Sequence, residues 1–145
     1  MRGLVVVVGV AAPFVWLGMV VAISFVETPL KFRAPGITVP LGLGIGRLVF
    51  HALNLVELGL AAVLTASWAV LGTSDQGWIL VGAVWALLGG QIGVLRPRLD
   101  RRTLAIIAGR TPPASRQHLV YIALEVTKVV LLAVIGATVA TAVSQ

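Results

Sequence analysis

Long apolar stretches alternate with short polar segments along the whole chain. They run at about 4–26, 43–71, 78–95 and 118–143, and each is long enough to cross a hydrocarbon core of about 30 Å. Because backbone groups in lipid must be paired internally, and the alternating pattern of a barrel strand is absent, we expect helices. The sequence therefore predicts an all-α polytopic membrane protein: a single domain, 1–145, built as a bundle of four transmembrane helices.

The composition agrees with this interpretation. Of 145 residues, 59% are hydrophobic and 11% are charged, whereas soluble domains contain about 25% charged residues. The chain has no cysteine, which excludes disulfide bonds and thiolate metal sites. The first apolar stretch exceeds the length of a secretion signal and leads directly into Glu27-Thr28-Pro29, so we assign it to a mature helix.

Basic residues are concentrated in two of the predicted loops, 27–42 and 96–117. Lys31 and Arg33 lie in the first loop, Arg47 follows it, and the second loop contains Arg96, Arg98, Arg101, Arg102, Arg110 and Arg116. The connection 72–77 has no basic residue. Since basic loops face the cytoplasm, we expect both termini outside a plasma (inner) membrane. The net charge of +6 thus indicates topology and argues against nucleic-acid binding.

Ionisable and amide side chains also lie inside the predicted helices. A charged group at a helix centre costs about 2.5–3.5 kcal/mol to insert, so these residues need an explanation. Those of the second helix share one face, and so do those of the fourth. The predicted binding or proton-coupling residues are Glu27, His51, Asn54, Glu57, Gln91, His118, Tyr121, Glu125 and Lys128. Most lie towards the basic loops, which predicts a polar pocket that faces the cytoplasm and is closed on the outer side.

This set of side chains fits several kinds of chemistry. A divalent cation is one candidate cofactor, with Glu57, Glu125, His51 and His118 as its ligands. A glutamate beside a lysine in a low dielectric can instead relay protons. A purely structural alternative pairs Lys128 with Glu125, or with Glu57 across the bundle. Trp16 and Trp85 are interpreted as packing residues.

The second basic loop predicts a short interfacial helix that begins near Asp100 and ends at Gly109. Its arginines would contact anionic headgroups, at about 1 kcal/mol for each basic residue. The predicted contacts with anionic lipid or phosphate are Lys31, Arg33, Arg47, Arg96, Arg98, Arg101 and Arg102. Small residues allow close helix approach and favour a homo-oligomer, through Gly42, Gly46, Gly82, Gly89, Gly90 and Gly93.

An internal repeat is one interpretation of the spacing. A shift of 68 residues aligns Pro29 with Pro97 and Glu57 with Glu125. Such a tandem repeat of two helices would resemble the parallel repeats of some transporters. Other positions do not align, because Lys31 falls on Leu99.

At Arg96-Pro97, the arginine-rich loop and His118, the chain resembles a family of small four-helix membrane proteins whose domain has no assigned function. The 25–32 stretch, with Pro29, adds to the likeness. The resemblance implies the fold and no activity. The pair of Glu125 and Lys128 is not part of that pattern.

From these features we expect a small membrane transporter or ion-binding protein that binds a cation or a proton. A membrane-embedded enzyme is less favoured; it would act on a lipid or phosphorylated substrate at the cytoplasmic face, with His118 or His51 as general base. No nucleophile-base pair or metal motif is recognisable in the sequence. A noncatalytic subunit or assembly factor of a larger membrane complex is the third interpretation.

Overall fold

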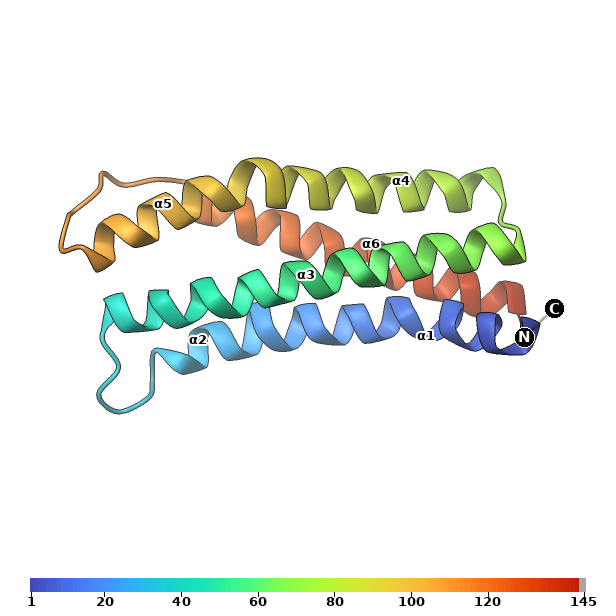
Figure 1. Cartoon of the computed structure of the whole chain (residues 1–145), viewed down its shortest axis with the longest axis horizontal. Coiled ribbons are helices and arrows are strands. Elements are labelled where there is room, and N and C mark those ends of the chain that lie inside the picture. Colours follow the sequence, from blue (N-terminus) through green and yellow to red (C-terminus); the bar gives the residue numbers. More distant parts are fainter. Residues whose placement is uncertain (144–145) are drawn as a thin grey trace.

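A computed structural model describes residues 1–143 of the chain. Within this range it contains helices and no strands, and four continuous helical rods lie side by side (Figure 1). The first rod consists of α1 (Arg2–Val20), η1 (Val21–Glu27) and α2 (Thr28–Lys31), and the second is α3 (Val39–Leu71). The third consists of α4 (Asp75–Gly89), η2 (Gly90–Leu95) and α5 (Arg96–Ile107), and the fourth is α6 (Gln117–Val143). Each rod is long and apolar enough to cross a membrane, as expected of an integral membrane protein.

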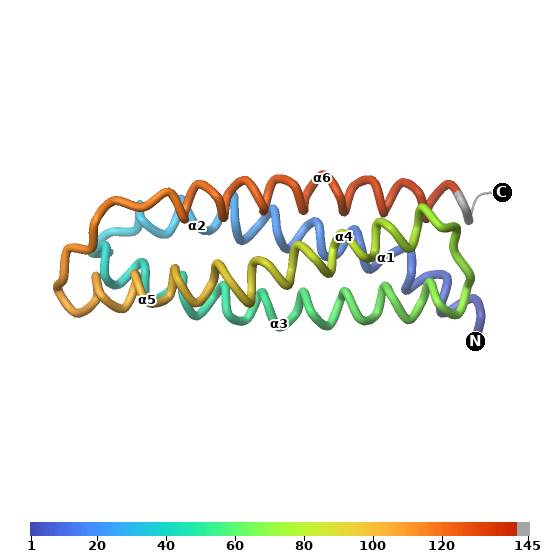
Figure 2. The backbone as a smooth tube through the Cα atoms, turned by 90° about the horizontal axis from the view of Figure 1, so that it is seen from above, coloured from blue at the N-terminus to red at the C-terminus, as the bar shows by residue number. Residues whose placement is uncertain are grey.

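The two ends of the molecule differ in their connections. The longer connections, 32–38 and 108–116, lie at one end, while the start of α1, the end of α6 and the short connection 72–74 lie at the other (Figures 1 and 2). We name the first the basic end, because it carries Lys31, Arg33, Arg47, Arg96, Arg98, Arg101, Arg102, Arg110 and Arg116. We name the other the terminal end.

Two helices begin earlier than the apolar stretches predict, because polar side chains cap them. Thr38 accepts the N–H of Leu41 at 3.4 Å, and Pro40 lies in the first turn of α3, where its missing N–H is not needed. At the start of α4, Ser74 accepts a backbone N–H at 3.3 Å. The predicted starts at 43 and 78 were therefore too late, and the loops are shorter than expected.

A π-helical segment lies just before a proline in both the first and the third rod. Pro29 follows η1 and Pro97 follows η2. A proline has no N–H, and its ring displaces the carbonyl four residues earlier; those residues, Phe25 and Gly93, lie within the π segments. The wider π turn keeps each rod continuous, and such turns are frequent at functional sites. The two segments correspond under the shift of 68 residues, but the repeat stays a prediction.

The helix predicted for the second basic loop is not a separate surface element. Instead, α5 continues from η2 without interruption, begins at Arg96 and packs against α3. Because the π segment keeps the chain helical through Pro97, the arginines of α5 lie on an extension of the third rod (Figure 1). Gly109, with φ of 76°, follows the end of this helix, as the sequence predicted.

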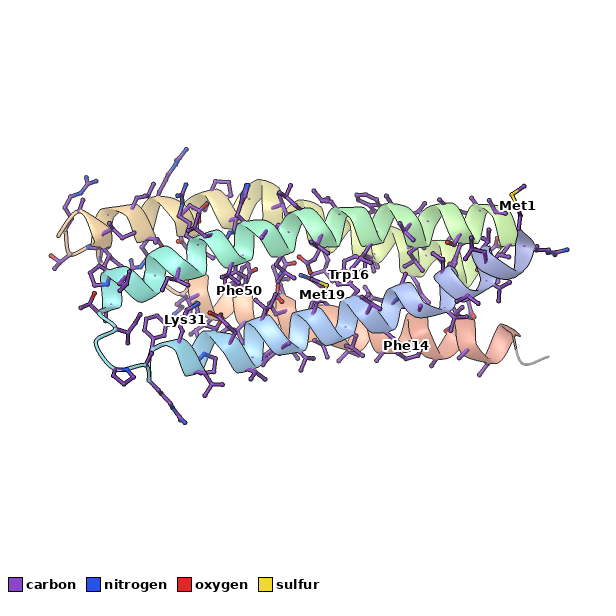
Figure 3. All side chains as sticks on the ribbon, turned by 60° about the horizontal axis from the view of Figure 1, so that its bottom comes forward. Met1, Phe14, Trp16, Met19, Lys31 and Phe50 are labelled. Atoms are coloured by element: carbon purple, nitrogen blue, oxygen red, sulfur yellow. The ribbon has the colours of Figure 1, made fainter. Side chains whose placement is uncertain are left out.

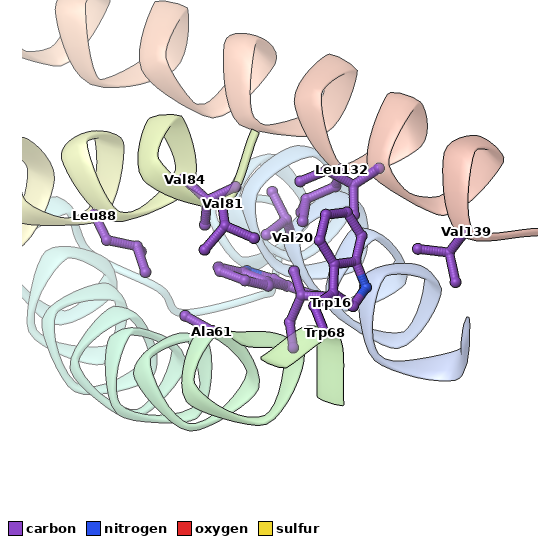
Figure 4. Packing of buried hydrophobic residues seen from close by; sticks show 11 residues of the cluster. Trp16, Val20, Ala61, Trp68, Val81, Val84, Leu88, Leu132 and Val139 are labelled. Carbon is purple, nitrogen blue, oxygen red and sulfur yellow. The ribbon is translucent and has the colours of Figure 1, made fainter. Parts of the chain in front are cut away.

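An apolar core extends from the middle of the molecule towards the terminal end. All four rods contribute to it, with Trp16, Val20, Ala61, Leu64, Trp68, Val81, Val84, Leu88, Leu132, Ile135 and Val139 (Figure 4). Many other large apolar side chains face outward, as contact with lipid requires. The core closes the terminal half of the molecule and leaves the basic half for polar groups.

The glycines predicted for helix packing fall into two groups. A methyl group at Gly42 would collide with the ring of Phe32, and one at Gly46 would lie 2.8 Å from Lys31 Nζ, so these glycines allow the first two rods to approach. The others have no described atom within 4 Å of a Cβ position: Gly82, Gly89, Gly90 and Gly93. These four remain open for contact with another chain, and the homo-oligomer stays a prediction.

Single-cysteine variants test this arrangement in a membrane. The chain has no native cysteine, so Ala34→Cys and Ser115→Cys place one thiol at the basic end, and Gln76→Cys places one at the terminal end. In sealed vesicles, a membrane-impermeant maleimide should label Gln76→Cys from one side and the other two variants from the opposite side. Labelling of all three variants from the same side would show that the rods do not each cross the bilayer.

Candidate functional site

A lysine and two glutamates form a buried charge cluster near the middle of the rods. Lys128 Nζ lies 2.6 Å from Glu57 Oε1 of α3 and 2.9 Å from Glu125 Oε1, one turn earlier on α6. The three side chains are at most 1% exposed. The sequence left the two pairings as alternatives, and the structure contains both. We name these three residues the buried triad.

Donors from the first and third rods complete the network. Trp16 Nε1 donates to Glu57 Oε1 at 2.9 Å. Gln91 Nε2, from η2, donates to Glu125 Oε1 at 2.8 Å, and Ser24 Oγ, from η1, donates to Glu125 Oε2 at 2.9 Å. Every rod therefore supplies a member of the network, and both π segments hold the same carboxylate.

The two carboxylates of the triad are not equally satisfied. Glu125 accepts three hydrogen bonds, and both of its oxygens take part. Glu57 accepts two, both at Oε1, while its buried Oε2 has no hydrogen-bond partner among the described residues. A buried oxygen without a donor is unfavourable, most of all when it is charged. Glu57 Oε2 is therefore, like Gln91 Oε1, a buried acceptor that the network leaves without a donor.

A cavity of about 580 Å³ occupies the basic end and reaches the triad at Glu125. Ser24 and Glu125 line it on the side of the triad, and three aromatic rings line it elsewhere: Phe25 of η1, Phe32 directly after α2, and Phe50 of α3. Figure 3 shows Lys31 and Phe50 towards the basic end and Trp16 nearer the middle. The cavity and the triad are thus adjacent and share one carboxylate.

Cationic and hydroxyl groups converge on Phe50 in the cavity wall. Tyr121 meets the Phe50 ring edge-on at 5.5 Å between centroids. The guanidinium carbon of Arg96 lies 5.0 Å from the Phe50 centroid, and Lys31 Nζ lies 5.8 Å from it. Tyr121 is 5% exposed, and its hydroxyl has no hydrogen-bond partner among the described residues. This wall therefore contains a buried hydroxyl that lies one turn from the Glu125 carboxylate on α6 and forms no well-aligned hydrogen bond with the described residues.

The predicted basic contacts divide into two groups. Those that line the cavity are Lys31, Arg47, Arg96 and Arg102, and those that are exposed outside it are Arg33, Arg98 and Arg101. Asp100, expected near a helix start, lies 3.8 Å from both Arg47 and Arg96. Arg102 also donates to the carbonyl of Pro113, which ties α5 to the connection that follows it.

The histidines do not join the triad. His51 is exposed on α3, and His118 lies in the cavity wall. Within the described residues, no group of three or more histidine, aspartate and glutamate side chains is placed to hold a metal ion. Lys128 occupies the space between Glu57 and Glu125. The four ligands suggested for a divalent cation are therefore not brought together here.

Two other predicted residues, Asn54 and Glu27, do not join the ion pairs of the triad. Asn54 is buried on α3, one turn before Glu57. Glu27 lies nearer the basic end, where its Oε2 is 3.2 Å from Lys31 Nζ. The site is therefore centred on three of the predicted ionisable residues and not on the whole set.

Sequence reasoning did not find Ser24 and assigned Trp16 to packing alone. Trp16 does lie in the apolar core, but its N–H also binds Glu57. Trp85, likewise assigned to packing, donates to Thr65 at 3.1 Å. Ser24 is the one hydroxyl residue between Trp16 and Glu27 in the sequence, and that isolation was the available signal.

A scan against protein-family models, a search of curated proteins and a search of solved structures each found no match for this chain. The fold and site define a helical membrane protein with a buried ion cluster beside a cationic, aromatic cavity.

Removal of the shared cation should destabilise the protein. Lys128→Met leaves two buried carboxylates without their partner, and breaking a buried ion pair costs about 3–5 kcal/mol. Arg110→Met is the matched control, because it removes a cation at an exposed position and should change the stability by about 0.5 kcal/mol or less. Reversible unfolding in detergent micelles measures both losses. Adding Glu57→Gln and Glu125→Gln to Lys128→Met should restore most of the stability, whereas wild-type stability of Lys128→Met alone would contradict the buried cluster.

Proposed function

We propose that the protein is a small membrane transporter that binds a proton at the buried triad and a substrate in the adjoining cavity. The observation that carries the proposal is the double role of Glu125. Its Oε1 lies 2.9 Å from Lys128 Nζ, and the same residue lines the cavity. A carboxylate shared by a titratable cluster and a substrate cavity allows each to sense the charge of the other.

The charge of the triad supports the binding of one proton. Two carboxylates face one ammonium group, so the fully ionised triad keeps a net negative charge in a low dielectric. One proton neutralises it. Glu125 accepts three hydrogen bonds, whereas Glu57 Oε2 accepts none, so a proton on Glu57 Oε2 disrupts the fewest bonds. We therefore assign the proton to Glu57.

The π segment η2 contains Gln91, whose hydrogen bond to Glu125 responds to protonation of Glu57. When Glu57 is neutral, Lys128 has Glu125 as its only ionised partner in the triad. Both Lys128 and Gln91 donate to the same atom, Glu125 Oε1. Competition for this oxygen weakens the bond from Gln91, because charge-assisted bonds are the stronger ones. Gln91 belongs to η2, and α5 beyond it carries part of the cavity wall. Protonation thereby loosens the contact between the third rod and α6 beside the cavity.

The excess of basic residues at one end supports an orientation with that end in the cytoplasm of a plasma (inner) membrane and both termini outside. In this orientation the cavity lies on the cytoplasmic side, and the apolar core separates it from the outer side. Transport then requires the core to part, or a homo-oligomer whose axis provides the exit. The outward-facing glycines of the third rod are suited to such contacts.

An enzyme acting on a lipid or phosphorylated substrate is the alternative that one observation favours, since His118 lies in the cavity wall beside cationic groups. The other suggested base, His51, is exposed on α3 and lies outside the cavity. A transporter accounts for the buried triad, which this alternative leaves without a role.

Infrared spectroscopy tests the proposed proton. A protonated carboxyl group has a C=O stretching band that a carboxylate lacks. We expect such a band in the wild type at neutral pH, its loss in Glu57→Gln, and its retention in Glu27→Gln, which removes a carboxyl group outside the triad. A wild-type spectrum without the band, or a band that survives Glu57→Gln, would rule out a proton on this residue.

Proton movement tests the role of Glu125. Under a potassium-diffusion potential, proteoliposomes loaded with a pH-sensitive dye should take up protons faster than protein-free liposomes. Glu125→Gln should reduce the rate to that of protein-free liposomes without preventing folding, which size-exclusion chromatography checks. Glu27→Gln should keep the wild-type rate. Normal uptake by Glu125→Gln would contradict the assignment of this carboxylate.

A further inference from the structure

We propose that the cavity at the basic end binds a small amphiphilic anion, consisting of an acidic head group on one short apolar chain. This anion would be the substrate of the proposed transporter. Only the claim that the anion is moved across the membrane rests on the proposed transport function. Binding itself is argued from the cavity.

Buried donor groups lie around Phe50 in the cavity wall. The side chains of Lys31 and Arg96 are 10% and 11% exposed, and both lie against the Phe50 ring. Tyr121 lines the same cavity with a hydroxyl that has no partner among the described residues. Buried polar groups almost always have hydrogen-bond partners, so this hydroxyl indicates a partner from outside the chain. An anionic group in the cavity can accept a hydrogen bond from this hydroxyl and is attracted by the cations of the wall.

The charges of the cavity wall also favour an anionic ligand. Four cationic side chains line the cavity, Lys31, Arg47, Arg96 and Arg102; among the nearby carboxylates, Glu125 is paired with Lys128 and Glu27 with Lys31. Arg47 and Arg96 share Asp100 at 3.8 Å, which is longer than a hydrogen bond, and the Nε of each has no hydrogen-bond partner among the described residues. Guanidinium groups with unused donors are suited to phosphate, sulfonate and carboxylate.

Apolar side chains also line the cavity. Phe25, Phe32, Leu43, Ile106 and Ile122 line the cavity together with the cations. A volume of about 580 Å³ lies within the range of about 300–1,000 Å³ that small-molecule sites occupy. Apolar walls beside a cationic group favour a ligand with an apolar chain over a purely polar anion such as free phosphate.

Binding can be measured on the protein in nanodiscs of zwitterionic phosphatidylcholine, with empty nanodiscs as the blank. Isothermal titration calorimetry would compare three ligands with the same chain: decanesulfonate, decyltrimethylammonium and decanol. We expect decanesulfonate to bind at least about tenfold more tightly than the other two, because its head group alone can accept bonds from the cations. Equal or tighter binding of decyltrimethylammonium or decanol would overturn the proposal.

Substitutions locate the binding site. Tyr121→Phe removes a hydroxyl that has no partner in the chain, so it should fold as the wild type does and bind decanesulfonate about tenfold more weakly. Lys31→Met should also weaken binding. Arg110→Gln removes one positive charge at an exposed position outside the cavity and should bind as the wild type does. Wild-type affinity in both Tyr121→Phe and Lys31→Met would place the ligand elsewhere.

A second series distinguishes a membrane lipid from a water-soluble amphiphile as the source of the anion. If the head group of an anionic lipid enters the cavity from the bilayer, nanodiscs that contain phosphatidylglycerol should lower the affinity for decanesulfonate by competition, after correction with empty discs of the same composition. Unchanged affinity would assign the cavity to a soluble amphiphile. Competition would keep the anion site but overturn the single short chain, because phosphatidylglycerol has two long acyl chains, whereas unchanged affinity would support the proposed ligand.

The two proposals can fail separately. Calorimetry needs neither a gradient nor proton uptake, and the infrared band of Glu57 is recorded without ligand. Absence of anion binding would remove the proposed substrate class and leave the proton site in place. Absence of the infrared band would remove the proton site and leave the anion cavity in place.

Discussion

The position of the Lys128 ammonium group between the carboxylates of Glu57 and Glu125 is the constraint on which the rest of the structure depends. The free-energy cost of removing three charged groups from water is offset only by close opposite charges and further hydrogen bonds. Here the further hydrogen bonds come from Trp16, Ser24 and Gln91. In lipid, apolar surface does not determine which helix faces meet, because lipid tails are as apolar as leucine. A polar network with members from all four rods can determine which helix faces meet.

The triad also divides the molecule into two halves with different properties. Towards the terminal end, side chains such as Leu64 and Ile135 fill the interior and leave it apolar. Towards the basic end, the rods enclose a cavity lined by aromatic and cationic side chains. The π segments lie at the boundary, and each holds Glu125 through one side chain. The triad thus contacts both halves, because Trp16 of the apolar core donates to Glu57 and Glu125 lines the cavity.

The sequence was sufficient for the parts that depend on helical periodicity and length. These include four long apolar helices, basic connections at one end, and the shared face of Tyr121, Glu125 and Lys128 on α6. It failed where tertiary packing decides. His51 lies about 120° from Glu57 around the helix, at the edge of the polar arc, and faces outward. Ser24 joins the site only because the first rod packs against α6, and the continuity of α5 depends on a π segment that periodicity does not show.

The most direct test of this account is a high-resolution experimental density map of protein purified without chelator, combined with elemental analysis of the same sample. The account predicts density for the Lys128 side chain between Glu57 and Glu125, within hydrogen-bond distance of both carboxylates, and no metal at a stoichiometric level. A metal peak bound by the two glutamates, with Lys128 displaced from the space between them, would contradict it.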